Sequence, residues 1–273
     1  SGFGLNRIIN DANGDGIFDG GIGEVDKYNL TSVRLGGEYG AQNARGLLVA
    51  NAELNQKRYS RDFSAVSRDN DTLNALLGFR ARLMPKTSFL VDYEFSDTNY
   101  KTDPARGGTA DTKDTRILGG ITWANTVQST GQLRLGQGKR QVDGGKEISK
   151  FTWDLGLLWS PTTLDKVNVI GGEKTTDASA PNSSVDSLYY AVSWRHQWLD
   201  RVETTAGIMS STDDYVLAPN APAGTLARKD DSLTYNLGVS YQMRRWLILG
   251  ANVSSNDRDS NNRQFSYTRN VMS

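Results

Sequence analysis

The sequence has no cysteine and a single histidine among its 273 residues. Without thiols, the protein has no disulfides, thiolate zinc sites or cysteine nucleophiles, and a cysteine-free chain is compatible with an oxidising compartment. An excess of charge of one sign is also lacking, because 31 basic residues balance 31 acidic ones. Such a chain has no net field that would attract nucleic acid or an anionic membrane surface. We therefore expect no nucleic-acid partner and no thiol chemistry.

Long apolar runs are absent as well. No stretch approaches the roughly 18 to 20 residues that a membrane-spanning helix needs, and the first residues do not form a signal peptide. We exclude a helical inner-membrane protein, and expect the sequence to be that of a mature form if the protein is exported. Proline is scarce at 6 residues, whereas 28 glycines, 6 tryptophans and 11 tyrosines favour strands and turns over helices.

A two-residue alternation of apolar and polar side chains dominates the chain. In FTWDLGLLW, one face of a strand carries Phe151, Trp153, Leu155, Leu157 and Trp159, while Thr152, Asp154 and Gly156 share the other. The same pattern recurs along the chain. It predicts fourteen strands, over residues 1–9, 28–39, 45–59, 70–84, 87–99, 112–124, 127–140, 148–160, 165–175, 184–196, 200–212, 231–243, 245–256 and 263–273.

The connections between these strands alternate in length. Short turns lie at AQNAR, MPKT, ANTV, SPTTLDK, HQWLD and MRRW, and longer polar loops lie at 10–27, 60–69, 100–111, 141–147, 176–183, 213–230 and 257–262. Outer-membrane barrels have short periplasmic turns and longer extracellular loops. Tryptophans gather near the short turns, as in the aromatic girdle at a bilayer edge: Trp123, Trp159, Trp194, Trp198 and Trp246.

These patterns predict an all-β protein, an antiparallel up-and-down transmembrane β-barrel that forms a single domain over residues 1–273. Its expected location is the outer membrane of a Gram-negative bacterium. A soluble barrel or sandwich with a dry core has the same periodicity. Against it, the predicted strands exceed the usual globular length of about 5 or 6 residues, and their polar faces carry many charges.

In a membrane barrel the charged faces point into the lumen. We predict that the pore is lined by Arg34, Glu38, Glu53, Arg80, Arg82, Asp92, Glu94, Arg116, Arg134, Asp154, Lys174, Arg195 and Glu203. Side chains of the wall alone fill a cylinder of this many strands only with difficulty, which favours a solvated channel. The cations and carboxylates could also pair across the wall, so a barrel plugged by its own ion pairs is an alternative.

Catalytic motifs are lacking. His196, in WRHQWLD, lies at a predicted short turn without a serine or carboxylate partner at a recognisable spacing, so we assign it a structural or interfacial role. The carboxylate pairs Asp92 with Glu94 and Asp213 with Asp214 are interpreted as lumen or loop charges. The sequence contains no P-loop, zinc spacing or nucleophile elbow. We predict no enzymatic activity and no required cofactor.

One motif does point to a ligand. NDANGDGIFDGG, residues 10–21, places Asp11, Asn13, Asp15 and Asp19 around a glycine turn, as calcium-binding loops do. The twelfth position of the loop is Ile22 in place of a bidentate glutamate, and Asn, Asp and Gly also form ordinary turns. We predict a Ca²⁺ site in the first extracellular loop, with an ordinary turn as the alternative.

The C-terminal third carries a family resemblance. It contains an R-x-D-D loop exit, a strand that ends in Y-x-x-R-R-W-L, and D-R-D-S-N followed by Y-x-R-N. In these motifs it resembles the Putative β-barrel porin type 2 family. TGQLRLGQGKR, FTWDLGLLWSPTTLDKVNV and SWRHQW are similar to family segments too, so the resemblance spans most of the chain. The matching motif residues are Arg228, Asp230 and Asp231; Tyr241, Arg244, Arg245, Trp246 and Leu247; Asp257 to Asn261; and Tyr267, Arg269 and Asn270.

The resemblance implies an outer-membrane barrel that provides a passage for an exopolysaccharide. Its implied partners are that polysaccharide, a periplasmic polysaccharide export protein, and the surrounding outer-membrane lipid and lipopolysaccharide. A general diffusion porin for small solutes and a plugged structural or adhesion barrel are the alternatives. The chain starts and stops inside predicted strands, so we expect that closing the barrel needs further residues or ragged edges, with a strand number that could exceed fourteen.

Overall fold

The computed structural model describes residues 2–4, 26–40, 45–60, 68–102, 109–123, 128–145, 147–177, 182–217, 221 and 223–273. They form one 14-stranded sheet in which antiparallel neighbours follow each other in chain order. This confirms the predicted all-β, up-and-down architecture. The strands are β1 (Gly2–Gly4), β2 (Asp26–Tyr39), β3 (Gly46–Tyr59), β4 (Asn70–Met84), β5 (Thr87–Tyr100), β6 (Thr112–Trp123), β7 (Ser129–Val142), β8 (Ile148–Trp159), β9 (Asp165–Asp177), β10 (Asn182–Leu199), β11 (Val202–Leu217), β12 (Lys229–Arg244), β13 (Leu247–Ser260) and β14 (Tyr267–Met272).

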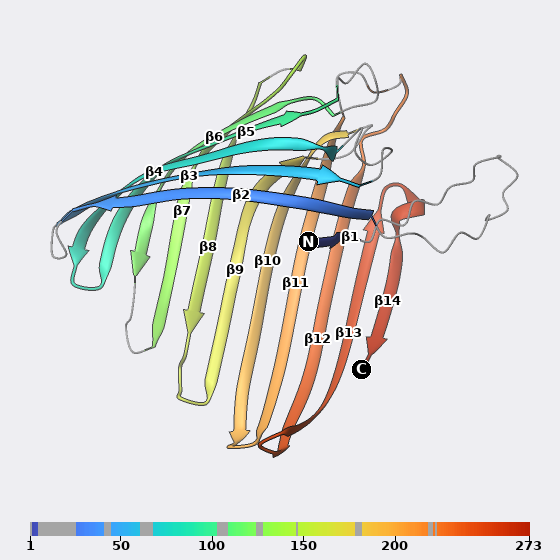
Figure 1. Ribbon diagram of the computed structural model, residues 1–273. Helices are drawn as coiled ribbons and strands as arrows, with labels where there is room; N and C mark the ends of the chain where they lie inside the picture. Colours follow the sequence, from blue (N-terminus) through green and yellow to red (C-terminus); the bar gives the residue numbers. More distant parts are fainter. Residues whose placement is uncertain are drawn as a thin grey trace, which may run out of the picture.

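The sheet is open within the described residues, with β1 and β14 as its two edges. Strand direction turns steadily across it, so that β2–β4 run across β9–β12 (Figure 1). Two glycines permit a very close approach of β6 and β7. A Cβ on Gly136 would lie 1.9 Å from the carbonyl oxygen of Ile117, and one on Gly120 would lie 2.1 Å from that of Leu133. Only glycine fits where two backbones come this close.

The strand boundaries differ from the predicted ones near the long loops. The predicted loop over 213–230 is too long, because β11 continues to Leu217 and β12 begins at Lys229. Lys229 Nζ lies 3.2 Å from Asp214 Oδ1 in this added part of the ladder. Where a barrel strand projects beyond the bilayer, both of its faces meet water, so the alternation that marks the strand fades. Of the predicted first strand, the structure describes only residues 2–4.

The last strand begins later than its predicted start at residue 263. Arg263–Phe265 forms a 3-10 turn, and the Oδ1 atom of its N-cap, Asn262, accepts a hydrogen bond from the Gln264 backbone N–H at 3.3 Å. An Asn cap of this kind satisfies a backbone donor that would otherwise enter a ladder. The turn therefore displaces the start of β14 to Tyr267.

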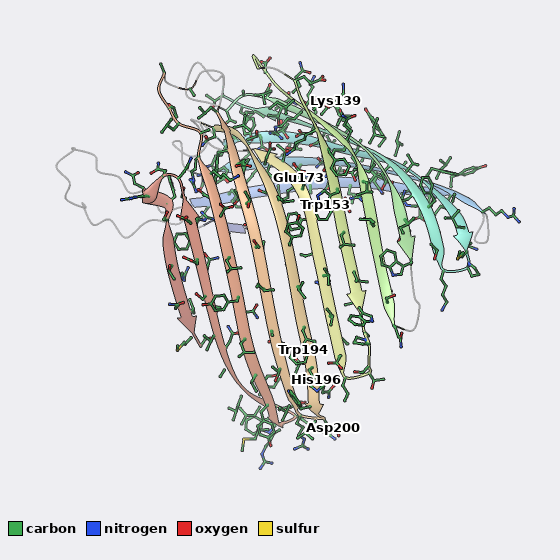
Figure 2. All side chains as sticks on the ribbon, turned by 180° about the vertical axis from the view of Figure 1, so that it is seen from behind. Lys139, Trp153, Glu173, Trp194, His196 and Asp200 are labelled. Atoms are coloured by element: carbon green, nitrogen blue, oxygen red, sulfur yellow. The ribbon has the colours of Figure 1, made fainter. Side chains whose placement is uncertain are left out.

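The two ends of the strands differ, as the connection lengths predict. The short turns lie at one end and the long connections at the other (Figure 1). Trp123 and Trp159 are the last residues of β6 and β8, and Trp246 lies in the turn between β12 and β13. Trp194 lies near the same end of β10, next to His196 (Figure 2).

The cross-strand register divides the sheet into two faces. Residues paired directly across neighbouring strands share a face, so Arg34, Glu53 and Asn74 lie together on the face that we call the inner face. The opposite, outer face presents large apolar side chains in strand after strand. Examples, with exposed fractions from 45% to 73%, are Leu35, Leu77, Ile117, Phe151, Tyr190, Ile208, Leu237 and Val253.

Buried apolar side chains are few. In the described part of the chain they are Leu90, Leu118 and Val142, and all three belong to the inner face by register. A soluble domain of this length would bury most of its apolar surface, and would rarely expose an apolar patch above about a few hundred Å². The dry-cored soluble alternative does not fit, and the outer face has the character of a lipid-facing surface. No helix in the described residues is long and apolar enough to cross a membrane.

Candidate functional site

The charged residues predicted to line a pore share the inner face by register. Two pairs lie apart from the rest: Arg34 Nη2 is 2.9 Å from Glu53 Oε1, and Arg195 Nε is 3.4 Å from Glu203 Oε1. Glu38, Arg82 and Lys174 have no ion-pair partner among the described residues, and the Lys174 ammonium lies 5.5 Å from the centroid of the Tyr189 ring. Six others form one cluster across β4–β8, which we call the charged wall: Arg80, Asp92, Glu94, Arg116, Arg134 and Asp154. That this face lines a pore stays a prediction.

Arg134 on β7 is the centre of the charged wall. Its Nε donates to Asp154 Oδ1 at 2.9 Å, and its Nη1 donates to Glu94 Oε1 at 2.6 Å and to Asp92 Oδ2 at 3.1 Å. Arg80 also pairs with Asp92, and Arg116 pairs with Glu94. Asp92 is fully buried, and two guanidinium groups compensate for its loss of water. Cations and carboxylates are equal in number in this cluster.

Sequence reasoning missed an extension of the charged wall toward the long-loop end. Arg140 is only 5% exposed, and its Nη1 lies 2.8 Å from Asp114 Oδ2. Lys150, on β8, also lies on the inner face by its pairing with Gly138. The same two-residue alternation that contains Arg116, Arg134 and Asp154 passes through these residues, so the signal was present in the sequence.

The ladder between β8 and β9 is incomplete. It runs from Trp159–Val167 only to Asp154–Gly172, although β8 begins at Ile148 and β9 continues to Asp177. The neighbouring ladders, β7–β8 and β9–β10, continue well past this level. The long-loop end of the β9–β10 hairpin has therefore separated from β8.

Side-chain contacts replace the missing ladder. Lys150 Nζ lies 2.8 Å from Glu173 Oε1 and 2.9 Å from Asp186 Oδ1. Thr152 Oγ1 donates to the carbonyl oxygen of Glu173 at 2.9 Å. By register Glu173 and Asp186 belong to the outer face, yet they contact Lys150 of the inner face. The separated end of the hairpin, residues 173–177 and 182–187, is thus turned toward the inner side of β5–β8. The local alternation gives no sign of this turn.

The inner face of β10–β13 has a different chemistry. Most of its inward residues are small and carry a hydroxyl, an amide or no side chain. We call this surface the hydroxyl wall. A groove of about 410 Å³ lies in its short-turn half, where the one charged lining residue is Glu203 and the others include Thr205, Gly238, Ser240, Gly250 and Asn252. The wall consists of Ser193, Thr205, Gly207, Ser211, Ser232, Thr234, Asn236, Gly238, Ser240, Gly250, Asn252, Ser254 and Asn256.

Residues of the family motif converge at the long-loop end of β12 and β13. Arg228 Nε and Ser260 Oγ both donate to Asp230 Oδ1, at 2.8 Å and 2.6 Å, and Asp230 is fully buried. The Arg228 guanidinium lies 3.6 Å from the centroid of the Phe265 ring. Hydrogen bonds to Asp230 hold the pKa of Arg228 above its usual value, against the opposing effect of burial. The motif spacing therefore encodes a buried clamp that ties two strands together.

His196 lies at the short-turn end of the outer face. Its Nδ1 is 2.7 Å from Asp165 Oδ1, which also accepts a hydrogen bond from Trp194 Nε1 at 3.0 Å. The rings of Trp194 and Trp198 flank the imidazole at centroid distances of 5.5 Å and 4.4 Å. Figure 2 shows Trp194 and His196 near the turn that holds Asp200. This aromatic cluster has the composition of an anchor at a bilayer edge.

The predicted calcium ligands Asp11, Asn13, Asp15 and Asp19 lie outside the described residues, and the calcium site stays a prediction. Among the residues that are described, no group of three or more His, Asp or Glu could hold a metal ion.

Comparisons with known proteins place the fold. The FrpB iron transporter of Neisseria meningitidis (F3-3 variant) aligns with a TM-score of 0.55 and 15% identity, over 86% of this chain and 44% of its own. The apoprotein form of its F5-1 variant gives 0.55 and 14%, over 86% and 45%. At such identities the likeness shows the fold alone, and this chain spans less than half the length of the FrpB structures. A search of curated protein sequences finds no match.

The family is shown by a match along the sequence. A family model described as Putative beta-barrel porin 2 matches residues 17–273, which is nearly the whole chain and includes the motif residues at Asp230 and Ser260. The apolar outer face and polar inner face agree with a porin-like role in an outer membrane. The chain belongs to the Putative beta-barrel porin 2 family.

Proposed function

We propose that this chain acts in the outer membrane of a Gram-negative bacterium as a conduit for an exopolysaccharide. The observation that carries the proposal is the hydroxyl wall, which gives the inner face a polar surface behind an apolar outer face. Its middle is uncharged, with Arg195 and Glu203 toward the short turns and Asp230 and Arg258 toward the long loops. Family membership supports the porin-like part of this role. The polysaccharide cargo is the part that we add.

The chemistry of the hydroxyl wall suits a sliding glycan. Each sugar hydroxyl both donates and accepts hydrogen bonds, as do the serine, threonine and asparagine side chains of the wall. Exchange of water for such partners changes the free energy little, because hydrogen bonds are replaced by similar ones. Conduction requires binding that is favourable enough for entry and weak enough for exit, and exchangeable hydrogen bonds of this kind would suit both requirements.

The partners follow from the two ends and the outer face. Outer-membrane lipid and lipopolysaccharide would cover the apolar outer face. At the short-turn end Trp198, Leu199 and Trp246 are 59%, 67% and 79% exposed, and a periplasmic export protein would deliver the polysaccharide there. The short-turn end would face the periplasm, as in other outer-membrane barrels.

The turned β9–β10 hairpin favours a second candidate, a barrel whose lumen is closed by its own wall. Conductance in planar bilayers separates the two functions. The conduit predicts stepwise currents from the purified full-length protein, whereas a plugged structural barrel would give none, alone or with its partners.

A gene deletion tests the cargo. We expect surface polysaccharide to be lost on deletion and restored by the wild-type gene and by Val253→Trp, whose new ring lies on the outer face. Ser254→Trp, one residue further along β13, places the same ring on the hydroxyl wall and is expected not to restore it. Unchanged polysaccharide on deletion, with altered uptake of small solutes, would replace the conduit by a general diffusion porin.

A further inference from the structure

A cavity of about 240 Å³ lies between the turned β9–β10 hairpin and the charged wall. Ser96 and Asp114 line it from β5 and β6, and Ser184 and Asp186 line it from β10. Its floor is Gly138, where an added Cβ would meet no atom closer than 3.6 Å. The volume is several times the roughly 30 Å³ that one water molecule occupies in the liquid. The hairpin therefore encloses a space that a small polar ligand could enter.

Ser184 carries an unmet hydrogen-bonding group into this cavity. The residue is fully buried, and its Oγ has no hydrogen-bond partner in the part of the chain that the structure describes. Neighbouring hydroxyls are satisfied: Thr152 Oγ1 donates to the Glu173 carbonyl at 2.9 Å, and Thr175 Oγ1 donates to Asp186 Oδ1 at 2.5 Å. Buried polar groups in folded proteins nearly always have a partner. The Ser184 hydroxyl thus points to a partner from outside the chain.

The charged groups around the cavity place donors beside acceptors. Lys150 has three N–H donors, and Glu173 and Asp186 each lie within ion-pair distance of it. Arg140 pairs with Asp114 in the same way. Five cations line the cavity, and four of them, Arg116, Lys139, Arg140 and Lys150, lie against a carboxylate. The fifth, Lys174, lies beside the Tyr189 ring. With most of its charges paired, the lining gives only a weak preference for a charged ligand. Adjacent donors and acceptors instead match neighbouring hydroxyl groups on a sugar ring, which both donate and accept.

We propose that this cavity binds one uncharged sugar residue, with its hydroxyl groups bonded to Ser184 Oγ, Lys150 Nζ and the Asp186 carboxylate. The inference rests on the proposed function, which supplies the sugar as part of the passing exopolysaccharide. Ile148 and Ser184 lie near the long-loop ends of their strands, so the site stands at the exit of the conduit. A sugar held there would occupy the space between the hairpin and the wall.

Saturation-transfer NMR on the full-length protein in detergent tests the site, with glucose, galactose, mannose and glucuronate as probes. We expect signal from at least one neutral hexose. Ser184→Ala should weaken it at least several-fold, and Ser184→Val, whose branched side chain occupies the space, should abolish it. Ser187→Ala is the matched control, because Ser187 lies on the same strand but belongs to the other face of the hairpin by register; it should keep the signal.

The fold of the variants is checked separately. The Ser184 hydroxyl has no partner within the described chain, so Ser184→Ala should leave heat-induced unfolding unchanged or slightly delayed. Equal hexose signal in the wild type and in Ser184→Val would overturn the site. So would the absence of signal from every neutral hexose, or binding of glucuronate alone that inorganic phosphate displaces, which would indicate an anion site.

Different results would contradict the sugar-site proposal and the conduit proposal. If deletion abolishes polysaccharide release but no hexose binds, the sugar site is wrong and the conduit stands. If a hexose binds as expected but release is independent of the protein, the conduit is wrong and the cavity serves another glycan.

Discussion

The charged wall of β4–β8 and the hydroxyl wall of β10–β13 share one face of one sheet, and they differ in how their side chains are held. In the charged wall Arg134 contacts three carboxylates on two other strands, and Asp92 is completely buried. In the hydroxyl wall the side chains are short and uncharged, with few bonds among them, such as that from Asn256 Nδ2 to Thr234 Oγ1 at 2.5 Å. Fixed ion pairs brace a wall, whereas short hydroxyls remain available to a passing solute. The comparison supports a bracing role for the charged wall, and in the proposed conduit the hydroxyl wall would be the surface that contacts the cargo.

The largest expected effect is that of Asp92→Ala in the charged wall. It leaves Arg80 and Arg134 partly uncompensated in a buried place, and the loss of one partner from a buried ion pair costs about 3 to 5 kcal/mol. Urea unfolding in detergent micelles measures the free energy of unfolding. Glu53→Ala removes the partner of the exposed Arg34 and is the control, with an expected cost below about 1 kcal/mol. If the two variants lost equal free energy of unfolding, the bracing role of the charged wall would be contradicted.

Gly136, on the inner face of β7 next to the charged wall, and Gly250 of the hydroxyl wall should respond differently to an added methyl group. Gly136→Ala would bring a Cβ to 1.9 Å from the Ile117 carbonyl oxygen, whereas in Gly250→Ala the nearest atom, the Val239 carbonyl oxygen, is 3.5 Å away. Overpacking of this kind costs about 1 to 3 kcal/mol, so we expect a loss of that size for Gly136→Ala and almost none for Gly250→Ala. The fraction folded after heating, read from mobility on SDS gels, compares them. A Gly250→Ala variant as unstable as Gly136→Ala would contradict the difference in packing.

One carboxylate added to the hydroxyl wall should change the ion selectivity of the pore. Ser254 is paired across the sheet with Asn236 and Val271, so Ser254→Asp would add a carboxylate with no cation opposite it. We expect the reversal potential in a salt gradient to shift toward cation selectivity, while Ser254→Thr leaves it unchanged. No shift in Ser254→Asp, with currents intact, would mean that the hydroxyl wall does not face the conducting path.

The smallest expected effect concerns the border between the two walls. Thr152→Val removes the hydrogen bond to the Glu173 carbonyl, at a cost of about 1 kcal/mol. Hydrogen exchange should become faster in residues 173–177, where side chains replace the ladder to β8. Thr115→Val changes a threonine of the outer face on β6 and should leave this region as it was. Identical exchange in both variants would mean that the Thr152 bond does not hold the hairpin.

The strand order and the two faces were predictable from the sequence because they depend on local alternation. β4 matches its predicted range, and β8 differs from its range by one residue. The same alternation placed Arg80, Arg134 and Asp154 on one face. It could not choose partners for them, because Arg134 reaches carboxylates on β5 and β8, and such choices depend on how the whole sheet curves.

The turned hairpin was not predictable from the sequence. Counting every second residue through Gly171 and Gly172 assigns Glu173 and Asp186 to the outer face. Because the hairpin has separated from β8, these two residues contact Lys150 of the inner face instead. The cavity was missed for this reason, because the sequence around Ser184 predicts only a serine in a strand and not a buried hydroxyl. The buried clamp of Arg228 and Asp230 was visible as a motif, but its geometry required the strands to be in place.

The register of the hydroxyl wall also determines how the free energy of a glycan would vary as the glycan moves along the wall. Inward residues recur along each strand at about twice 3.3 Å, and strands lie about 4.7 to 4.9 Å apart, while Ser193, Gly207, Asn236 and Ser254 form one row across four strands. A glycan would thus pass from one polar group to another in steps of a few ångströms. Its energy profile would consist of many shallow wells, so that drag on the whole chain, and not release from a single site, would set the speed of transit before the exit.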